Sequence, residues 1–221
     1  MGDVLYLWPD AARVERRVPK ERFYEQGTVS ASTRERFVSE VGRITWAYKL
    51  ADATINLPDS VSVPEIQVFR IEAKDKDVSD HVLSAIDKAI PSPIIFELVR
   101  EAEGKRQIRV VAAHKQPGLN APKITQHFSS DWISAVEARQ PLPTAISLAA
   151  LYAALLEPLT EVEVRPGEGM SEVADRLKEV GKLEREITAL QRKIKNEKQL
   201  NRRIELRRTL KAKESLLEQQ R

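Results

Sequence analysis

The sequence contains no cysteine in its 221 residues. This absence excludes a disulfide framework, a thiolate metal site and a cysteine nucleophile. The three histidines, His81, His114 and His127, are scattered, so a histidine-rich metal site is not expected. No apolar run reaches the roughly 18 residues of a membrane-spanning helix. The N-terminus also lacks the basic and long apolar regions of a signal peptide. We therefore expect a cytoplasmic protein.

The sequence also lacks the common motifs of nucleotide and hydrolase sites. It has neither GxGxxG nor GxxxxGK[ST], which argues against a dinucleotide or P-loop enzyme. It has neither HExxH nor GxSxG, so the usual zinc-protease and serine-hydrolase patterns are missing as well.

Hydrophobic residues make up 42% of the chain and charged residues 31%, a balance that supports a buried core. The net charge of +3 conceals an asymmetry. Residues 171–221 contain 15 basic and nine acidic residues, net +6, whereas residues 1–170 carry a net charge of −3. The stretch 192–213 alone holds ten basic and two acidic residues. Such a charge distribution attracts a polyanion or an acidic protein surface.

Hydrophobic patterning predicts an α+β body over residues 1–165, built on a mixed sheet of five or six strands with flanking helices. Ser32 and Glu35 have the spacing of a capping box, which predicts that a helix begins there. Pro166-Gly167-Glu168-Gly169 indicates a linker at 166–170, followed by a basic helical or coiled-coil extension at 171–221. The expected helices are 32–41, 78–90 and 145–156, and the expected strands are 44–49, 53–57, 65–74, 93–99 and 107–113.

Apolar residues in the extension recur every three or four positions, as in the seam of a coiled coil. The phase changes after Ile194, which leaves two arrangements open. One is a single helix of about 49 residues, and the other is a hairpin that turns near residues 195–199. The apolar stripe must be buried against its own second half, the body, a second copy in a homodimer, or another protein.

The basic residues of the extension are the candidates for contact with nucleic acid or a protein partner, although a solvated helix face is the alternative. Acidic residues are too scarce there for i,i+4 pairing to neutralise them. No aromatic residue lies in 171–221, so we expect salt-dependent contact with a phosphate backbone rather than base stacking. The candidates are Arg192, Lys193, Lys195, Lys198, Arg202, Arg203, Arg207, Arg208 and Lys211.

A second candidate site is catalytic. Pro58-Asp59 is followed by Glu72-Ala73-Lys74, a pattern that resembles the PD-(D/E)xK nuclease superfamily. Asp59 and Glu72 could hold Mg²⁺ through carboxylate oxygens, and Lys74 could orient water or stabilise charge on a phosphate. The resemblance implies a further glutamate from the first helix, here Glu35 or Glu40. The alternative is that Asp59 belongs to an ordinary turn and that Glu72 and Lys74 form a solvated pair.

Several longer segments resemble the bacterial and archaeal family catalogued as domain of unknown function 4391, over essentially the full length. The resemblance implies a small cytoplasmic protein encoded beside helicases and DNA methyltransferases in restriction-like, phage-defence clusters. The segments that carry it are Val18–Lys20, Ile44–Leu50, Thr54–Leu57, Val63–Phe69, Ile86–Pro91, Pro93–Leu98, Arg139–Thr144 and Glu197–Arg203.

We therefore expect an accessory, non-catalytic subunit of a DNA-processing or defence assembly. Its body would dock on a helicase or DNA methyltransferase, and its extension would contact nucleic acid or that partner. No cofactor is expected in this case. The alternatives are a Mg²⁺-dependent nuclease that uses Asp59, Glu72 and Lys74, and a structural protein that self-associates through the extension.

Overall fold

The computed structural model describes residues 4–25, 29–116, 123–160, 170–197 and 199–220. The chain divides into two compact units, Met1–Leu159 and Thr160–Arg221, which are described separately. Most of the predicted linker, residues 166–169, lies outside the described residues, and Met170 is the first residue of a helix.

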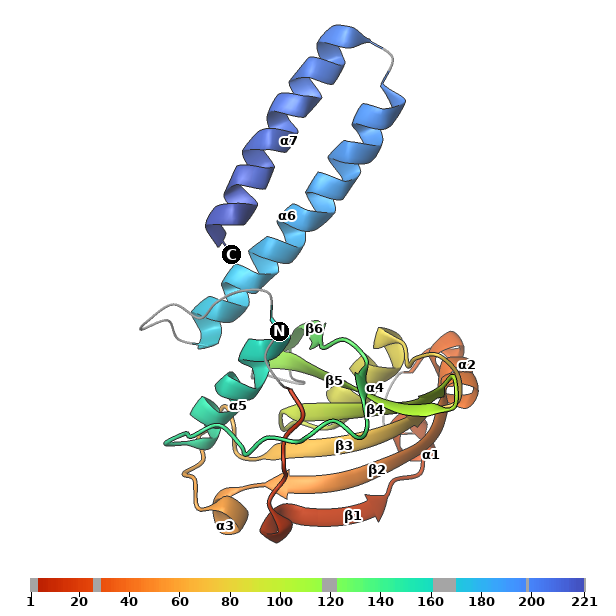
Figure 1. The fold of residues 1–221 in the computed structure, drawn as a ribbon, viewed down its shortest axis with the longest axis vertical. Helices are drawn as coiled ribbons and strands as arrows, with labels where there is room; N and C mark the ends of the chain where they lie inside the picture. Colours follow the sequence, from red (N-terminus) through yellow and green to blue (C-terminus); the bar gives the residue numbers. More distant parts are fainter. Residues whose placement is uncertain (1–3, 26–28, 117–122, 161–169, 198, 221) are drawn as a thin grey trace. The chain divides into compact units, whose positions relative to one another are not determined.

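Unit 1 is built on a mixed seven-stranded sheet (Figure 1). Six strands lie side by side in the order β1-β2-β3-β4-β5-β6, and the short β7 pairs with β5. Only β3 and β4 are parallel, whereas the other paired strands are antiparallel. The sheet confirms the predicted mixed α+β class and has more strands than the expected five or six. The strands are β1 Arg13–Arg17, β2 Val41–Leu50, β3 Ile66–Ala73, β4 Ile94–Ala102, β5 Lys105–Gln116, β6 Lys123–Ser129 and β7 Ile133–Ser134.

The helix that follows β3 makes the crossover that a parallel pair of strands requires. This helix, α4, spans Asp80–Ala89. Two single-turn 3₁₀ helices, Asp10–Ala12 and Glu157–Leu159, complete unit 1. The α-helices are α1 Glu21–Glu25, α2 Ala31–Glu40, α3 Asp52–Ile55, α4, and α5 Leu148–Leu156 in unit 1, with α6 Met170–Asn196 and α7 Leu200–Gln220 in unit 2.

The main core lies between the sheet and helices α1, α2 and α4. Phe37 of α2 and Ile86 of α4 are fully buried against Ile71 and Phe96 of the central strands. Because side chains alternate along a strand, Glu97 faces the opposite side of the sheet from Phe96. On that side the N-terminal segment crosses the sheet, where the Leu7 amide donates to the Gln140 carbonyl at 2.6 Å.

Two local predictions, the capping box at Ser32 and the strand at 53–57, were wrong because hydrogen bonds from other capping side chains decided the local structure. Helix α2 begins after Ser30, whose hydroxyl accepts from the Thr33 amide at 3.2 Å, so the predicted Ser32 capping box is not formed. The predicted strand at 53–57 is the short helix α3. The Thr54 hydroxyl accepts from the Ala51 amide at 2.9 Å, and Asn56 ends the turn in the left-handed conformation. Both features favour a helical turn over an extended strand.

Candidate functional site

Unit 2 consists of two antiparallel helices, α6 and α7, which form a hairpin. The hairpin confirms the second of the two predicted arrangements, because α6 ends at Asn196 and α7 begins at Leu200. Two contacts join the helices far from the turn. Arg176 donates to the Gln220 carbonyl at 2.8 Å, and Lys213 forms an ion pair with Glu186.

The apolar seam of α6 is buried within this one chain. Val180, Leu183 and Ile187 are 5 to 9% exposed. The side chains of Val173 and Leu177, which the sequence places on the same seam, lie outside the described residues.

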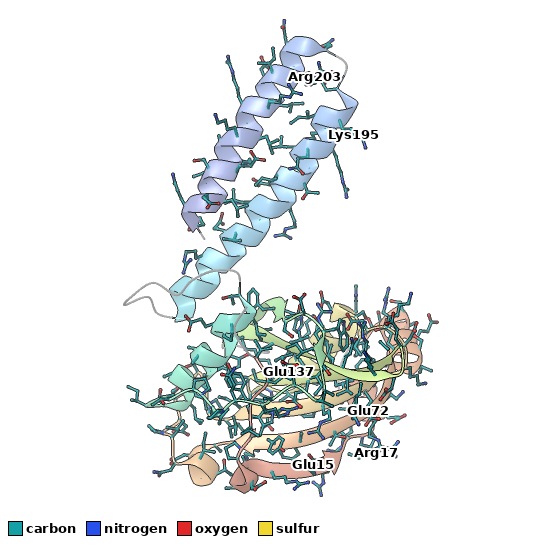
Figure 2. All side chains as sticks on the ribbon, in the orientation of Figure 1. Glu15, Arg17, Glu72, Glu137, Lys195 and Arg203 are labelled. Carbon is teal, nitrogen blue, oxygen red and sulfur yellow. The ribbon has the colours of Figure 1, made fainter. Side chains whose placement is uncertain are left out.

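The two contacts between the helices also set their register. They place Arg192 level with about residues 204–207 of α7, and Lys195 level with about residues 201–204. Figure 2 shows Lys195 and Arg203 near the end of the hairpin where α6 turns into α7. The basic stretches of α6 and α7 therefore lie beside each other, although they are separated by the turn in sequence.

We define the basic end of the hairpin by its eight described cations. Seven are exposed, and Arg203 is partly buried. Lys198, which the sequence places in the same group, lies outside the described residues. The basic end consists of Arg192, Lys193, Lys195, Arg202, Arg203, Arg207, Arg208 and Lys211.

Few carboxylates neutralise the basic end. Of its eight cations, only Arg202 forms an ion pair with a described residue, at 3.8 Å from Glu197. Glu197 also accepts from the Gln199 amide at 2.9 Å, which stabilises the turn. The Nε of Arg203 is enclosed and has no hydrogen-bond partner among the described residues. The arrangement leaves a dense positive charge open to solvent, which can bind a large anion but supplies no nucleophile or acid–base pair.

The predicted catalytic residues come from a loop and from the end of a strand. Asp59 is exposed in the loop between α3 and β3. Glu72 lies near the last residue of β3. The described residues contain no group of three or more histidines and carboxylates that could hold a metal ion.

Glu72 and Lys74 do lie at the same end of β3, but each has a structural partner. Arg43 of β2 is 3.9 Å from Glu72, and the Lys74 ammonium donates to the Val38 carbonyl of α2 at 2.7 Å. A lysine at a helix C-terminus satisfies a carbonyl that has no partner within the helix.

The two glutamates that the resemblance offers as further ligands, Glu35 and Glu40, both lie on α2. Glu35 is exposed on α2. Glu40 binds Arg36 at 3.2 Å and the Ser79 amide at 2.8 Å, so it joins α2 to the start of α4.

The structure assembles a buried polar cluster that the motif search missed. The Asp87 carboxylate is 2.9 Å from the Lys115 ammonium and 2.7 Å from Nε2 of His127. Lys115 also donates to the Ile90 and Ser92 carbonyls at 2.7 and 2.6 Å, which occupies all three of its hydrogens. Burial lowers the pKa of Lys115, and the Asp87 carboxylate opposes that shift. Asp87 lies on the apolar face of α4, directly after Ile86. A carboxylate at such a position was the only signal in the sequence for this buried cluster.

A second buried carboxylate fastens the segments that cross the other side of the sheet. Glu97 is 1% exposed. Its Oε1 accepts from Trp8 Nε1 at 2.8 Å and from Arg139 at 2.7 Å, while Arg70 lies 3.7 Å from its Oε2. Arg139 also donates to the Tyr6 carbonyl at 2.8 Å. These contacts hold Trp8 and Arg139 on the sheet and assign Glu97 a structural role.

Comparisons with known proteins identify one family. No curated protein and no solved structure matches the chain. None of the described helices is both long enough and apolar enough to cross a membrane. One family model matches residues 7–217, which cover the strands of unit 1 and nearly all of the hairpin. The chain therefore belongs to the family described as a domain of unknown function (DUF4391).

Proposed function

We propose that the chain is an accessory, non-catalytic cytoplasmic subunit of a bacterial DNA-processing or restriction-like phage-defence assembly. Unit 1 docks on a helicase or DNA methyltransferase, and the hairpin contacts nucleic acid or that partner. The type of partner comes from the resemblance to the family, whereas the contact made by the hairpin rests on its charge.

The observation that carries the proposal is the basic end of the hairpin. Eight cations gather on two neighbouring helices, and only Arg202 has a carboxylate partner among the described residues. Folding alone gives no reason to gather like charges that repel one another. A bound anionic surface would offset this repulsion, so the arrangement favours a binding role.

The contacts of unit 1 favour a non-catalytic role. Its buried charges, Asp87 and Glu97, are occupied by internal partners. Glu72 pairs with Arg43, and Lys74 donates to the Val38 carbonyl. No group of three or more histidines and carboxylates that could hold a metal ion occurs in the part of the chain that the structure describes.

Co-expression tests the docking role. The full chain should be produced with the helicase and, separately, with the DNA methyltransferase encoded beside it. We expect one of them to co-elute with the chain in size-exclusion chromatography, at a fixed ratio measured by light scattering. Failure of both to form a complex would contradict the proposal.

A nuclease assay of the isolated chain tests the non-catalytic role. We expect plasmid DNA to stay intact in millimolar Mg²⁺ or Mn²⁺. Cleavage that is lost in Glu72→Gln and retained in the matched exposed variant Glu101→Gln would contradict the proposal and favour the nuclease alternative.

A further inference from the structure

We infer that the basic end of the hairpin binds the phosphate backbone of double-stranded nucleic acid and does not read its bases. The inference rests on the proposed function and names the ligand of the hairpin.

The charge density of the basic end matches that of a duplex. From Leu200 to Lys211, α7 extends over about 17 Å, and the basic part of α6 lies level with it. A nucleic-acid duplex carries one negative charge per roughly 1.7 Å of its axis, or about ten charges over this length. Eight cations can therefore meet a comparable number of phosphates. An acidic protein surface would need a similar row of carboxylates, whose mutual repulsion disfavours it.

The width of the hairpin favours contact across the backbone. Each helix is about 10–12 Å in diameter with its side chains, so the pair is roughly 20 Å wide. The major groove of B-DNA is about 12 Å wide and accepts a single helix. Because the basic end is formed by both helices, it is too broad to enter the groove and must lie on the phosphates at its edges.

The side chains of the hairpin suit phosphates and not exposed bases. Residues 171–221 contain no phenylalanine, tyrosine or tryptophan, so the hairpin has no surface on which unpaired bases can stack. Five of the eight cations are arginines, whose planar guanidinium groups form paired hydrogen bonds to phosphate oxygens. Single strands offer the same phosphates but a lower charge density, so a duplex is the preferred ligand.

Fluorescence anisotropy of the full chain with labelled duplexes tests the inference. The probes are a DNA duplex of mixed sequence, a second DNA duplex with shuffled base pairs, an RNA duplex, and one single strand of the first DNA. We expect equal affinity for the two DNA duplexes and weaker binding of the single strand. For six phosphate contacts the affinity should fall about 10³-fold between 50 and 200 mM salt.

A matched pair of variants locates the contact. Arg207→Gln with Arg208→Gln removes two exposed cations of the basic end, and Lys182→Gln with Arg185→Gln removes two exposed cations of α6 outside it. In the first variant the negative slope of log affinity against log salt concentration should become shallower by about two. The second should leave the slope unchanged. Circular dichroism should show equal helix content in both variants.

Three results would overturn the inference. They are no binding of any duplex at 50 mM salt, single-strand binding as tight as duplex binding, and tighter binding of polyglutamate than of the duplexes. The last result would identify an acidic protein surface as the ligand. If the chain forms a complex with its partner enzyme but binds no duplex, this inference fails and the proposed function stands. If it binds duplexes but neither enzyme, the proposed function fails instead. Preference for the DNA or the RNA duplex identifies the source of the phosphates and supports the inference.

Discussion

At the residue scale, each described buried charge of unit 1 lies beside a side chain that can carry the opposite charge. Asp87 is 1% exposed and contacts both Lys115 and His127. Lys115 also donates to the Ile90 carbonyl just after α4, so one ammonium joins β5 to that helix. A buried ion pair contributes little net stability relative to apolar residues, but the loss of one partner leaves the other charge uncompensated.

We therefore expect Asp87→Asn to lower the free energy of unfolding by about 3 kcal/mol. The measurement is urea denaturation of the full chain followed by circular dichroism. Asp80→Asn is the matched control on the same helix, because Asp80 is exposed and should cost less than about 1 kcal/mol. Equal losses in the two variants would show that the buried pair has no special role.

Glu65 is a second residue for which the structure makes a specific prediction. Burial by itself would raise its pKa, but the contacts from Lys49, Ser92 and Gln67 outweigh burial and hold the pKa below its ordinary value. Lys49 lies 2.7 Å from Oε2 of Glu65, and the Ser92 hydroxyl donates to Oε1 at 3.1 Å. The ionised carboxylate therefore stabilises the folded state.

A carboxyl group whose pKa is lower in the folded state than in the unfolded state stabilises the fold at pH values above its unfolded-state pKa. This stabilisation is lost as the pH falls through the folded-state pKa. Glu65→Gln should therefore be less stable than the parent chain near pH 7, and the difference should shrink between about pH 5 and 3. Urea midpoints measured at several pH values test this. A difference between the two chains that does not change with pH would contradict the assignment.

At the element scale, the hairpin depends on packing between α6 and α7. Most of the described side chains of helix α7 are exposed to solvent. Its stability should come largely from contact with α6, since most of the stability of a helix in a protein comes from the packing of one face. Ile187 is 9% exposed in this packing.

Ile187→Asp should unfold the hairpin, because it places a charge at a buried position without a partner. We expect a loss of helical signal and a lower melting temperature, with no change of oligomeric state in sedimentation. Ala189→Asp is the control, since Ala189 is exposed two residues away. A shift to a smaller species in sedimentation would show instead that the seam joins separate chains.

At the scale of the whole molecule, charge and fold divide the chain in the same way. Residues 1–159 carry a net charge of −1 and residues 160–221 a net charge of +4, and the boundary between the two compact units falls between Leu159 and Thr160. The described strands and the buried Asp87 and Glu97 all belong to unit 1. Unit 1 therefore has its own core and does not need the hairpin to complete the sheet.

A chain that ends at Gly169 should unfold cooperatively and should no longer bind phosphocellulose at low salt. The full chain should bind the matrix and elute as the salt concentration rises, because counterion exchange controls its affinity. Thermal unfolding and gradient elution provide the two measurements. Equal retention of both chains would place the polyanion contact on unit 1 and contradict the role of the hairpin.

Several features of this protein were determined by sequence alone. Strands β2, β3 and β4 were predicted because runs of β-branched and aromatic residues favour extended strands. The basic end was predicted because charge is a property of composition and needs no tertiary contact. The helical character of α6 and α7 followed from apolar residues spaced by three or four.

Tertiary structure decided which residues meet. The pattern around Glu72 and Lys74 could not show that Glu72 lies beside Arg43 or that Lys74 donates to the Val38 carbonyl, because both partners come from other elements that the sheet brings alongside β3. Nor could it show that Asp87 meets Lys115 and His127, which come from two other elements. Apolar spacing also left a straight helix and a hairpin open, and the lack of glycine or proline at 195–199 counted against the hairpin. Only the packing of α7 on α6, which buries Ile187, brings the two halves of the basic end together.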